Sequence, residues 1–385
     1  MRFLVDARPA LDPRRTGVGR YARELLAELP RADPGATYVA WYLHARGVLR
    51  PRRFLDAAPN LEERASRFPA RVFQPLSWRL GAPRVEWLAG PFDALLATNF
   101  LPPATGRLDR CVLVVHDLAF ERHPGTAPHI DGRWRRRFAR ALARCAAVVV
   151  PSRATAEDLA ELHGVGPERV HVVPHGVRAE RFAPPPDAAE RIRLVRERFG
   201  IGGDYVLFVG GIEPRKNLRR LVRAFASVGG GAWLVLAGGP VRWSPRAAEE
   251  VAAEVARLPA EARRRVVRTG YVADEDRLAL LWGARLLAYP SLAEGFGLPV
   301  LEAFAAGVPV LTSRASSLPE VAGEAALLVD PLDEDAIAEG IARLLGDEEL
   351  RGRLRAAGLE RCRLFTWRRT AEATAAVLRA AAGSG

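Results

Sequence analysis

The chain has 385 residues, which at roughly 150 residues per domain predicts two domains. Its 49% hydrophobic and 26% charged residues lie in the globular range and exclude disordered and fibrous classes. The formal net charge of +12 favours anionic partners: phosphorylated small molecules, lipid headgroups or nucleic acid. No apolar run approaches the roughly 18 residues that span a bilayer, and the first residues do not resemble a signal peptide, so we expect a soluble, cytoplasmic protein.

Short apolar runs alternate with helical patterns along the first half of the chain. Six runs are typical of buried strands: residues 2–6, 38–43, 93–97, 111–116, 146–150 and 169–173. Apolar residues at helical spacing occur between them, at residues 21–29, 134–144 and 155–163. Strands alternating with helices predict a mainly parallel sheet covered on both faces, so the first domain is expected to be Rossmann-like.

The second half repeats this pattern after three consecutive prolines at residues 184–186. Its expected strands are residues 205–210, 232–238, 265–270, 285–290, 308–313 and 325–330. Two such halves predict an α/β fold in which two Rossmann-like domains face each other across a cleft. We expect an N-terminal domain over residues 1–183, a C-terminal domain over 184–365, and a last helix, 366–385, that packs back on the first domain.

Cysteine and histidine spacing gives no sign of a disulfide framework or a metal site. The three cysteines, Cys111, Cys145 and Cys362, are far apart and form no C-x-x-C motif. The seven histidines show no H-E-x-x-H or similar ligand spacing. We therefore expect neither a metal nor a bound cofactor.

The segment YPSLAEGFGLPVLEAFAAGVPV, residues 289–310, is the most informative part of the sequence. It follows an expected strand, and its glycines let the backbone approach a ligand before a short helix over residues 298–306, which Gly307 ends. The start of such a helix presents free amides and the positive end of a dipole, and so predicts an anion site, most plausibly for a phosphate. The residues expected to border this ligand are Gly295, Phe296, Gly297 and Leu298.

Two carboxylates, Glu294 and Glu302, lie in the same segment, and the glycines and proline allow the loop to bring both to one ligand. A carboxylate beside a phosphate site does not bind the phosphate, so these two are expected to accept hydrogen bonds from hydroxyls, as on a sugar. The alternative is that Glu294 is a solvated loop residue and that Glu302 lies on an exposed helix face.

The chain contains a single lysine, Lys216, so 56 of its 57 basic residues are arginine. Lys216 and Arg215 stand in VGGIEPRKNLRRLVRAF, residues 209–225, which again has the form strand, glycine turn, helix. A compact ammonium at this turn is suited to a pyrophosphate. The alternatives are chance use of lysine and an ordinary charged start of a surface helix.

Two features of the first domain suggest ligand contacts. RRTGVGRYARELL, residues 14–26, matches G-x-G-x-x-A, but roughly ten residues separate it from its strand, and no acidic residue ends the next strand. We therefore expect a glycine loop whose Gly17 and Val18 amides are available to a phosphate, rather than the fingerprint of a nicotinamide-dependent dehydrogenase. His116 ends a buried run, where α/β proteins place ligand contacts, although a lone histidine is more often structural.

Residues 131–145, DGRWRRRFARALARC, form a basic amphipathic pattern. Such a helix is suited to anionic lipid headgroups, and a solvated helix face is the alternative. No nucleic-acid recognition motif accompanies it, so we expect no nucleic-acid partner.

The motifs together resemble a known family, the retaining nucleotide-sugar-dependent glycosyltransferases of the GT-B fold, family 4, also called glycosyl transferases group 1. The resemblance covers nearly the whole chain. It rests on GVGRY (17–21), HDL (116–118), VPSRATAEDL (150–159), VVPHGV (172–177), GGIEPRKN (210–217), the E-x7-E pair and SSLPEVAG (316–323).

The resemblance implies roles for the residues of the second domain. Arg215 and Lys216 would stabilise the diphosphate leaving group, Glu302 would bind the ribose hydroxyls, and Glu294 would bind hydroxyls of the transferred sugar. In the first domain, Gly17 would offer amides to the phosphate and His116 would lie beside the sugar.

The resemblance also implies the substrates. The donor would be a nucleoside-diphosphate sugar, with GDP-mannose favoured and UDP-glucose as the alternative, and no metal would be needed. The acceptor would be a hydroxyl of a glycan, a lipid-linked glycan or a small molecule, within polysaccharide biosynthesis. The basic pattern at residues 131–145 adds the expectation of peripheral contact at the inner face of the membrane.

Overall fold

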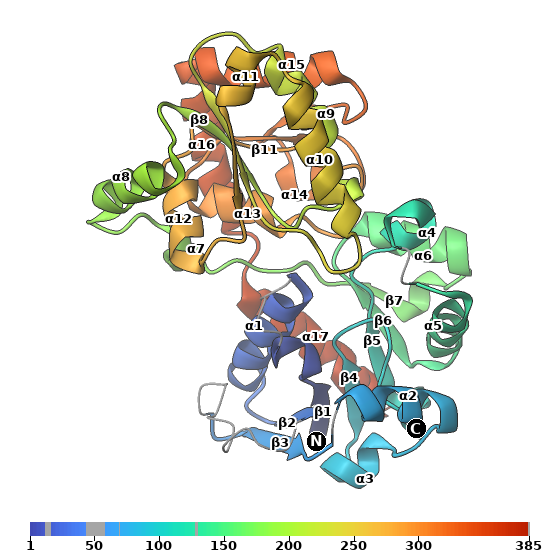
Figure 1. Cartoon of the computed structure of the whole chain (residues 1–385). Helices are drawn as coiled ribbons and strands as arrows, with labels where there is room; N and C mark the ends of the chain where they lie inside the picture. Colours follow the sequence, from blue (N-terminus) through green and yellow to red (C-terminus); the bar gives the residue numbers. More distant parts are fainter. Residues whose placement is uncertain (12–16, 44–57, 69, 128–129, 384–385) are drawn as a thin grey trace. The chain divides into compact units, whose positions relative to one another are not determined.

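The computed structural model describes residues 1–11, 17–43, 58–68, 70–127 and 130–383. The chain divides into two compact units (Figure 1). Unit 1 consists of Met1–Leu118, Ile130–Gly176 and Thr366–Gly385, and unit 2 consists of Ala119–His129 and Val177–Phe365.

Unit 1 gives way to unit 2 after Gly176 and not after residue 183, where the prolines suggested a boundary. The reason is that helix α7 (Ala179–Phe182) is already held in unit 2. The indole nitrogen of Trp282 donates a hydrogen bond to the carbonyl of Phe182 at 2.7 Å. The prolines therefore follow the change of unit and introduce helix α8 (Ala188–Phe199).

Unit 1 is built on a parallel sheet of seven strands in the order β3-β2-β1-β4-β5-β6-β7. The strands are β1 (Arg2–Asp6), β2 (Thr37–Leu43), β3 (Leu61–Ser66), β4 (Ala94–Ala97), β5 (Cys111–Val114), β6 (Ala147–Val150) and β7 (Val170–Val172). Six of them were expected, because strands covered on both faces have continuous apolar runs. The exception is β3, whose sequence LEERAS is mostly polar because, among the described strands, it lies at the edge of the sheet and pairs with β2 alone.

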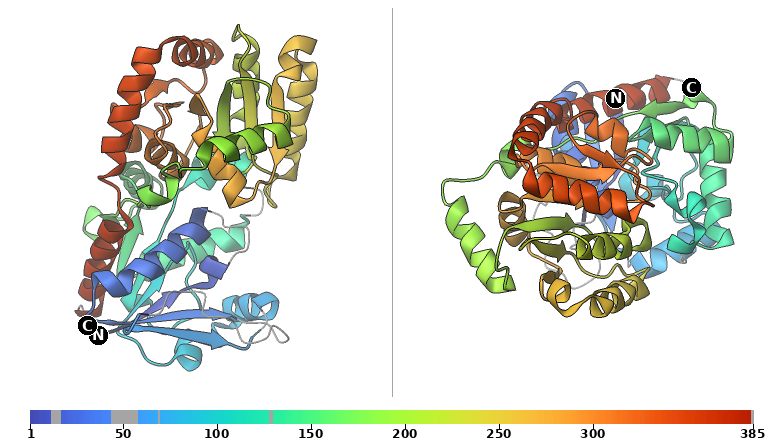
Figure 2. Two further views of the ribbon diagram at one scale, coloured as in Figure 1. Left: turned by 90° about the vertical axis from the view of Figure 1, so that its left-hand side faces the viewer. Right: turned by 90° about the horizontal axis from the view of Figure 1, so that it is seen from above.

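The helices of unit 1 include one from the end of the chain. They are α1 (Gly17–Ala32), α2 (Ala70–Leu80), α3 (Val85–Ala89), α5 (Gly132–Arg144), α6 (Arg153–His163) and α17 (Trp367–Gly383). Helix α17 packs beside α1 (Figure 2). The hydroxyl of Thr370 donates to the carbonyl of Pro174 at 2.7 Å, and Arg379 forms an ion pair with Asp33.

Unit 2 contains a second parallel sheet, of six strands in the order β10-β9-β8-β11-β12-β13. The strands are β8 (Tyr205–Val209), β9 (Trp233–Ala237), β10 (Val266–Gly270), β11 (Leu286–Tyr289), β12 (Val310–Ser313) and β13 (Leu327–Val329), and all six were expected. Besides α7 and α8, its helices are α4 (Ala119–Arg122), α9 (Leu218–Ala226), α10 (Pro245–Arg257), α11 (Ala260–Arg264), α12 (Asp274–Trp282), α13 (Leu298–Ala305), α14 (Leu318–Ala322), α15 (Glu334–Gly346) and α16 (Glu348–Cys362).

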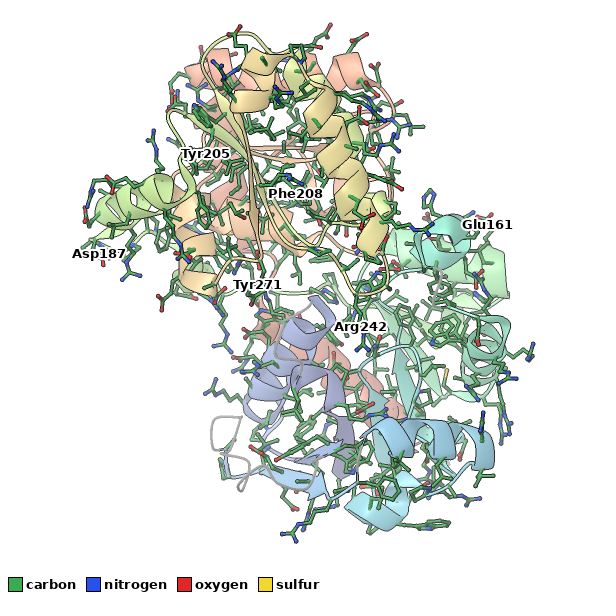
Figure 3. All side chains as sticks on the ribbon, viewed as in Figure 1. Glu161, Asp187, Tyr205, Phe208, Arg242 and Tyr271 are labelled. Atoms are coloured by element: carbon green, nitrogen blue, oxygen red, sulfur yellow. The ribbon has the colours of Figure 1, made fainter. Side chains whose placement is uncertain are left out.

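The order of the second sheet reverses at its two central strands. Successive strands run outward from β8 through β9 to β10 on one side, and from β11 through β12 to β13 on the other. Tyr205 and Phe208 of β8 are fully buried in the core (Figure 3), and the Phe208 ring stacks on Tyr289 of β11 at 5.7 Å. In open α/β sheets ligands bind outside the carboxyl ends of the strands at such a reversal, so the residues that follow β8 and β11 are the first candidates for a site.

Among the residues with a described structure, no helix combines the length and the apolar character needed to cross a bilayer.

Candidate active site at the carboxyl edge of the second sheet

The segment that follows β8 carries the two cations singled out in the sequence. After Val209 the chain reaches a 3-10 turn over Pro214–Lys216, and α9 begins at Leu218. Asn217, between the turn and the helix, is left-handed, with φ of 61°. The turn buries the Lys216 side chain, which leaves only 6% of the residue exposed.

The segment that follows β11 carries Glu294. Gly297, with φ of 105°, lies directly before α13, and a Cβ there would approach a Leu318 methyl carbon to 2.7 Å. Glycine is therefore required at this turn both by its backbone conformation and by packing. The expected short helix is confirmed as α13, and Pro299 lies in its first turn.

The loop residues expected to border a ligand are placed as follows. Gly295, Phe296 and Gly297 are buried and Leu298 is half-buried. The Phe296 ring packs edge-on against Phe365 at 5.7 Å, so its side chain contributes to the core of unit 2. What this loop offers a ligand is therefore its backbone, together with the first amides of α13.

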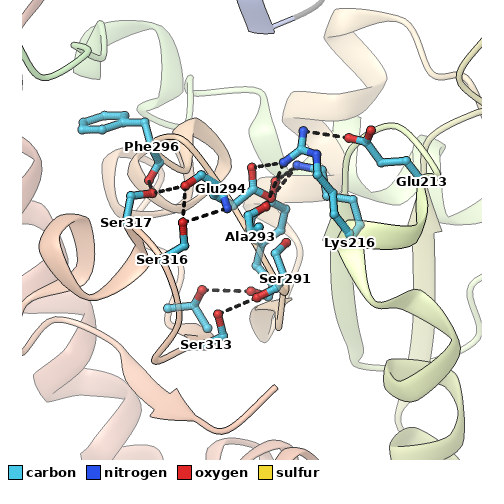
Figure 4. A network of polar contacts seen from close by, with 12 residues as sticks. Glu213, Lys216, Ser291, Ala293, Glu294, Phe296, Ser313, Ser316 and Ser317 are labelled. Atoms are coloured by element: carbon cyan, nitrogen blue, oxygen red, sulfur yellow. Dashed lines mark hydrogen bonds and ion pairs between the residues drawn. The ribbon is translucent and has the colours of Figure 1, made fainter. Parts of the chain in front are cut away.

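The structure brings Arg215, Lys216 and Glu294 together in one cluster (Figure 4). Lys216 Nζ lies 2.6 Å from Glu294 Oε1 and 2.5 Å from the hydroxyl of Tyr289. Arg215 Nη1 lies 2.6 Å from Glu294 Oε2, and Arg215 Nη2 lies 2.7 Å from Glu213 Oε1. Two cations and two carboxylates thus meet at the reversal of the sheet, which makes Glu294 a buried ion-pair partner and not a solvated loop residue.

The charges in this cluster shift one another's pKa values. Burial alone would raise the pKa of Glu294, but the positive charges of Arg215 and Lys216 outweigh it and lower that pKa to about 2. Burial, assisted by the Arg215 charge, lowers the pKa of Lys216, while burial and the Glu294 charge raise that of Tyr289. Such perturbed groups are typical of functional sites.

Glu302 has a separate cationic partner. It lies on α13 with 4% of the residue exposed, and its Oε2 accepts a hydrogen bond from Arg277 Nη1 at 2.6 Å. Arg277, on α12, also pairs with Asp274, and its guanidinium lies over the Phe182 ring. Glu302 is therefore not on an exposed helix face. The structure joins Glu294 and Glu302 to different arginines.

In unit 1, Gly17 and Val18 form the start of a helix. They are the first two residues of α1, which corrects the expected glycine loop at these two positions. Their amides still lie among the four at a helix start that have no acceptor within the helix. The helix includes these positions because Val18 continues the i, i+3, i+4 apolar spacing of Tyr21 and Ala22 toward the N-terminus.

His116 follows β5 in unit 1 and is buried. Its Nε2 lies 2.9 Å from the carbonyl of Thr98, and its ring packs edge-on against Tyr21 at 5.0 Å. His175 lies 5.7 Å from it, ring to ring, and stacks on Trp367 of α17. Burial lowers the pKa of both histidines, so both are neutral near pH 7.

Several residues of the site had no signal in the sequence. Tyr289 stands at the end of an expected strand, Glu213 and Arg277 are among many charged residues, and Asn217 follows the lysine with no role indicated by the sequence. Ser316 stood in a motif but not as a contact. Among the described residues, no three His, Cys, Asp or Glu side chains gather in a way that could hold a metal ion.

Family models match both halves of the chain. The model described as glycosyl transferases group 1 matches residues 195–361, and the model described as glycosyltransferase family 4 matches residues 15–181.

Individual relatives agree with these matches. The chain is 29% identical to O-antigen chain mannosyltransferase B of Escherichia coli over 91% of this chain and 93% of that protein. It is 33% identical to the D-inositol 3-phosphate glycosyltransferase of Xylanimonas cellulosilytica over 76% of this chain and 69% of that protein.

The fold has counterparts among solved structures. Anabaena HepE, solved in complex with UDP and glucose, superposes with a TM-score of 0.70 at 18% identity, covering 99% of this chain and 100% of that one.

A nicotinamide-dependent dehydrogenase, the alternative that two Rossmann-like halves left open, is not supported. The chain has the α/β GT-B fold, belongs to the group 1 glycosyltransferases of family 4, and is a glycosyltransferase.

Proposed function

We propose that this glycosyltransferase moves a hexose, with mannose favoured, from a nucleoside-diphosphate sugar to a hydroxyl acceptor with retention of anomeric configuration. The observation that carries the proposal is the pair formed by buried Lys216 and half-buried Arg215 at the reversal of the second sheet. Mannose is favoured because the E. coli relative that matches 91% of this chain is a mannosyltransferase. Transfer of glucose from UDP-glucose is the alternative, supported by the UDP and glucose bound to HepE.

The chemistry of the leaving group fits this pair of cations. Cleavage of the bond between sugar and diphosphate develops negative charge on the diphosphate and positive charge on the sugar ring. Cations fixed beforehand in a buried site stabilise the first of these charges without reorganising water at the moment of reaction. A lysine ammonium has three protons, and acceptors among the described residues take two of those of Lys216, namely Tyr289 and Glu294.

The two carboxylates are suited to the neutral parts of the donor. Glu294 stays ionised above about pH 2, so it is an acceptor for hydroxyls of the transferred sugar at any physiological pH. For Glu302 we propose the ribose hydroxyls, with Arg277 holding its carboxylate in place. The amides of the loop from Gly295 to Leu298 would bind phosphate oxygens.

In unit 1, His116 and the amides of Gly17 and Val18 are the proposed contacts. We assign the neutral imidazole of His116 to the transferred sugar, since burial keeps it uncharged. The first amides of α1 are suited to phosphate oxygens.

A metal ion is not required by this account. Arg215 and Lys216 together supply two positive charges where a divalent cation would otherwise neutralise the diphosphate. Activity that persists in a chelator is therefore expected, and retention is testable by NMR of the anomeric proton in the first product formed.

The acceptor is proposed to be a lipid-linked glycan at an anionic membrane surface. Helix α5 begins at Asp131, whose side chain accepts from the Trp134 amide at 2.7 Å, and it buries Phe138 on one face. The arginines exposed along the helix are Arg133, Arg136, Arg140 and Arg144. A basic face of this kind is suited to anionic headgroups, which would hold the enzyme near a lipid-linked substrate on the cytoplasmic side.

Incubation with a panel of nucleotide sugars tests the proposal. GDP-mannose and UDP-glucose are compared without acceptor, and slow release of the nucleoside diphosphate is measured. The proposal expects release from GDP-mannose, or from UDP-glucose if the alternative holds. If the folded protein releases nucleoside diphosphate from none of the nucleotide sugars in the panel, the proposal is contradicted.

A further inference from the structure

Two residues other than glycine have a left-handed backbone in the described part of the chain, Asn217 with φ of 61° and Ser316 with φ of 56°. This conformation costs energy in a residue with a Cβ, and it persists only where the surroundings hold it. Both residues border the same cluster. Asn217 directly follows Lys216, and Ser316 bonds the backbone of Glu294.

The side chain of Asn217 joins loops from three places in the sheet. Its Nδ2 donates to the carbonyl of Pro290 at 3.0 Å and to that of Pro331 at 2.6 Å. Pro290 follows β11 and Pro331 lies just beyond β13, so the amide ties the turn that carries Lys216 to the segment that leads to Glu294.

Helix capping does not explain Asn217. It precedes the first residue of α9, where an asparagine usually has an extended backbone and accepts from the helix amides. Here the backbone is left-handed and the side chain makes no capping hydrogen bond. Both amide protons are directed to the neighbouring loops instead.

Ser316 holds the other half of the cluster. Its hydroxyl donates to the Glu294 carbonyl at 2.6 Å and lies 3.3 Å from the Glu294 amide, which donates to it. The adjacent Ser317, fully buried, adds a hydroxyl 2.8 Å from the same carbonyl. The peptide units on both sides of the Glu294 side chain are thereby fixed from the loop that follows β12 (Figure 4).

We propose that Asn217 and Ser316 are positioning residues that fix Lys216 against Glu294 in the geometry that sugar transfer requires. Asn217 sets the place of the ammonium and Ser316 that of the carboxylate, each through side-chain bonds to backbone. The inference rests on the proposed function, because it assigns the two residues to the same reaction.

Glycine substitutions test it, because glycine accepts the left-handed backbone without cost and removes only the side-chain bonds. We expect Asn217→Gly and Ser316→Gly each to lower kcat by about tenfold to a hundredfold, with a smaller change in the KM of the donor, since a displacement of about 1 Å costs on that order. Unchanged kcat in both variants would overturn the proposal. Should one variant fail to fold, the other carries the test.

Asn60 provides a matched control. Its Nδ2 also bonds backbone carbonyls, those of Pro30, Asp33 and Ala36, but it belongs to unit 1, whereas the cluster belongs to unit 2. Asn60→Ala is expected to lower the thermal midpoint and to leave kcat per folded molecule unchanged.

A double-mutant cycle separates positioning from general stability. If Asn217 acts through Lys216, adding Asn217→Gly to the Lys216→Ala variant causes little further loss of kcat. The same factor of loss in both backgrounds would mean that Asn217 is merely structural. If Lys216→Ala itself has wild-type turnover, the proposed function fails, and that outcome is distinct from a failure of the positioning role.

Discussion

Lys216 Nζ and Glu294 Oε1 lie 2.6 Å apart although 78 residues separate them in the chain. The contact joins the turn after β8 to the loop after β11, which are the two strands at which the sheet order reverses. The only lysine of the chain is thus held at the place where parallel sheets bind their ligands.

Replacement of Lys216 tests the leaving-group role. We expect Lys216→Ala to lower turnover by on the order of a hundredfold or more, the usual scale for removal of a donor to developing charge. Lys216→Arg is not expected to restore it, since a planar guanidinium does not fit between Tyr289 and Glu294 as an ammonium does. Steady-state rates with the preferred donor measure this.

The control for Lys216 is Arg219→Ala. Arg219 is half-exposed on α9, near Glu250 and Glu254. Its removal deletes one charge close in sequence without touching the cluster, so turnover should remain near wild type. Wild-type turnover in Lys216→Ala would discredit the site.

Glu302 and Arg277 are expected to act together in nucleotide binding. Glu302→Ala removes the proposed acceptor for the ribose hydroxyls, and Arg277→Met leaves that buried carboxylate without its cation. We expect each to weaken binding of the nucleoside diphosphate by about tenfold or more, since hydrogen bonds to a charged group contribute roughly 1.5–3 kcal/mol. Calorimetry measures the affinity.

Glu334→Gln is the control for this pair, because Glu334 pairs with Arg223 on the surface of the same unit. Its affinity for the nucleotide should match wild type. An unchanged affinity in Glu302→Ala would move the ribose to another part of the protein.

The low pKa of Glu294 predicts how stability depends on pH. The folded-state value of about 2 lies below the ordinary value of 4.5, so the ionised carboxylate stabilises the fold fully above pH 4.5, and this contribution is lost as the pH falls toward 2. Wild type should therefore be more stable than Glu294→Gln at pH 7, and the difference should shrink below pH 4.5.

Urea denaturation of both proteins between pH 7 and pH 3 measures this difference. The comparison removes the effect of carboxylates outside the cluster, which titrate alike in the two proteins. A difference in midpoint that stays constant over the whole range would show that the ion pairs of Glu294 do not stabilise the fold.

The basic face of α5 predicts membrane binding that depends on charge. Reversal of two of its exposed arginines, as in Arg136→Glu with Arg140→Glu, should weaken sedimentation with vesicles of anionic lipid, at roughly 1 kcal/mol per lost basic residue. Arg193→Glu with Arg363→Glu is the control, because it makes the same change of charge at exposed positions of unit 2. Equal binding by both double variants would mean that α5 is only a solvated face.

The sequence was most informative for the strands, most of which are continuous segments of buried side chains. Twelve of the thirteen strands in the described part of the chain were predicted, because parallel strands are covered on both faces and need apolar side chains throughout. The exception, β3, is an edge strand, where one side of the ladder is unpaired and polar residues are tolerated.

For the candidate site, the sequence indicated Arg215, Lys216, Glu294 and Glu302 through residue type and glycine-framed turns. It did not indicate which residues these four contact in the folded protein. The Arg277–Glu302 bond spans 25 residues and the Asn217–Pro331 bond 114, so both depend on how the loops converge in the folded sheet. The left-handed backbone of Ser316 had no signal, because serine rarely adopts it.

A crystal structure of the protein with its nucleotide-sugar donor, or with the nucleoside diphosphate, tests the central claim most directly. The account predicts the diphosphate at the carboxyl ends of β8 and β11, with phosphate oxygens within hydrogen-bond distance of Lys216 Nζ and Arg215. Phosphorus atoms bound far from these two side chains would contradict it.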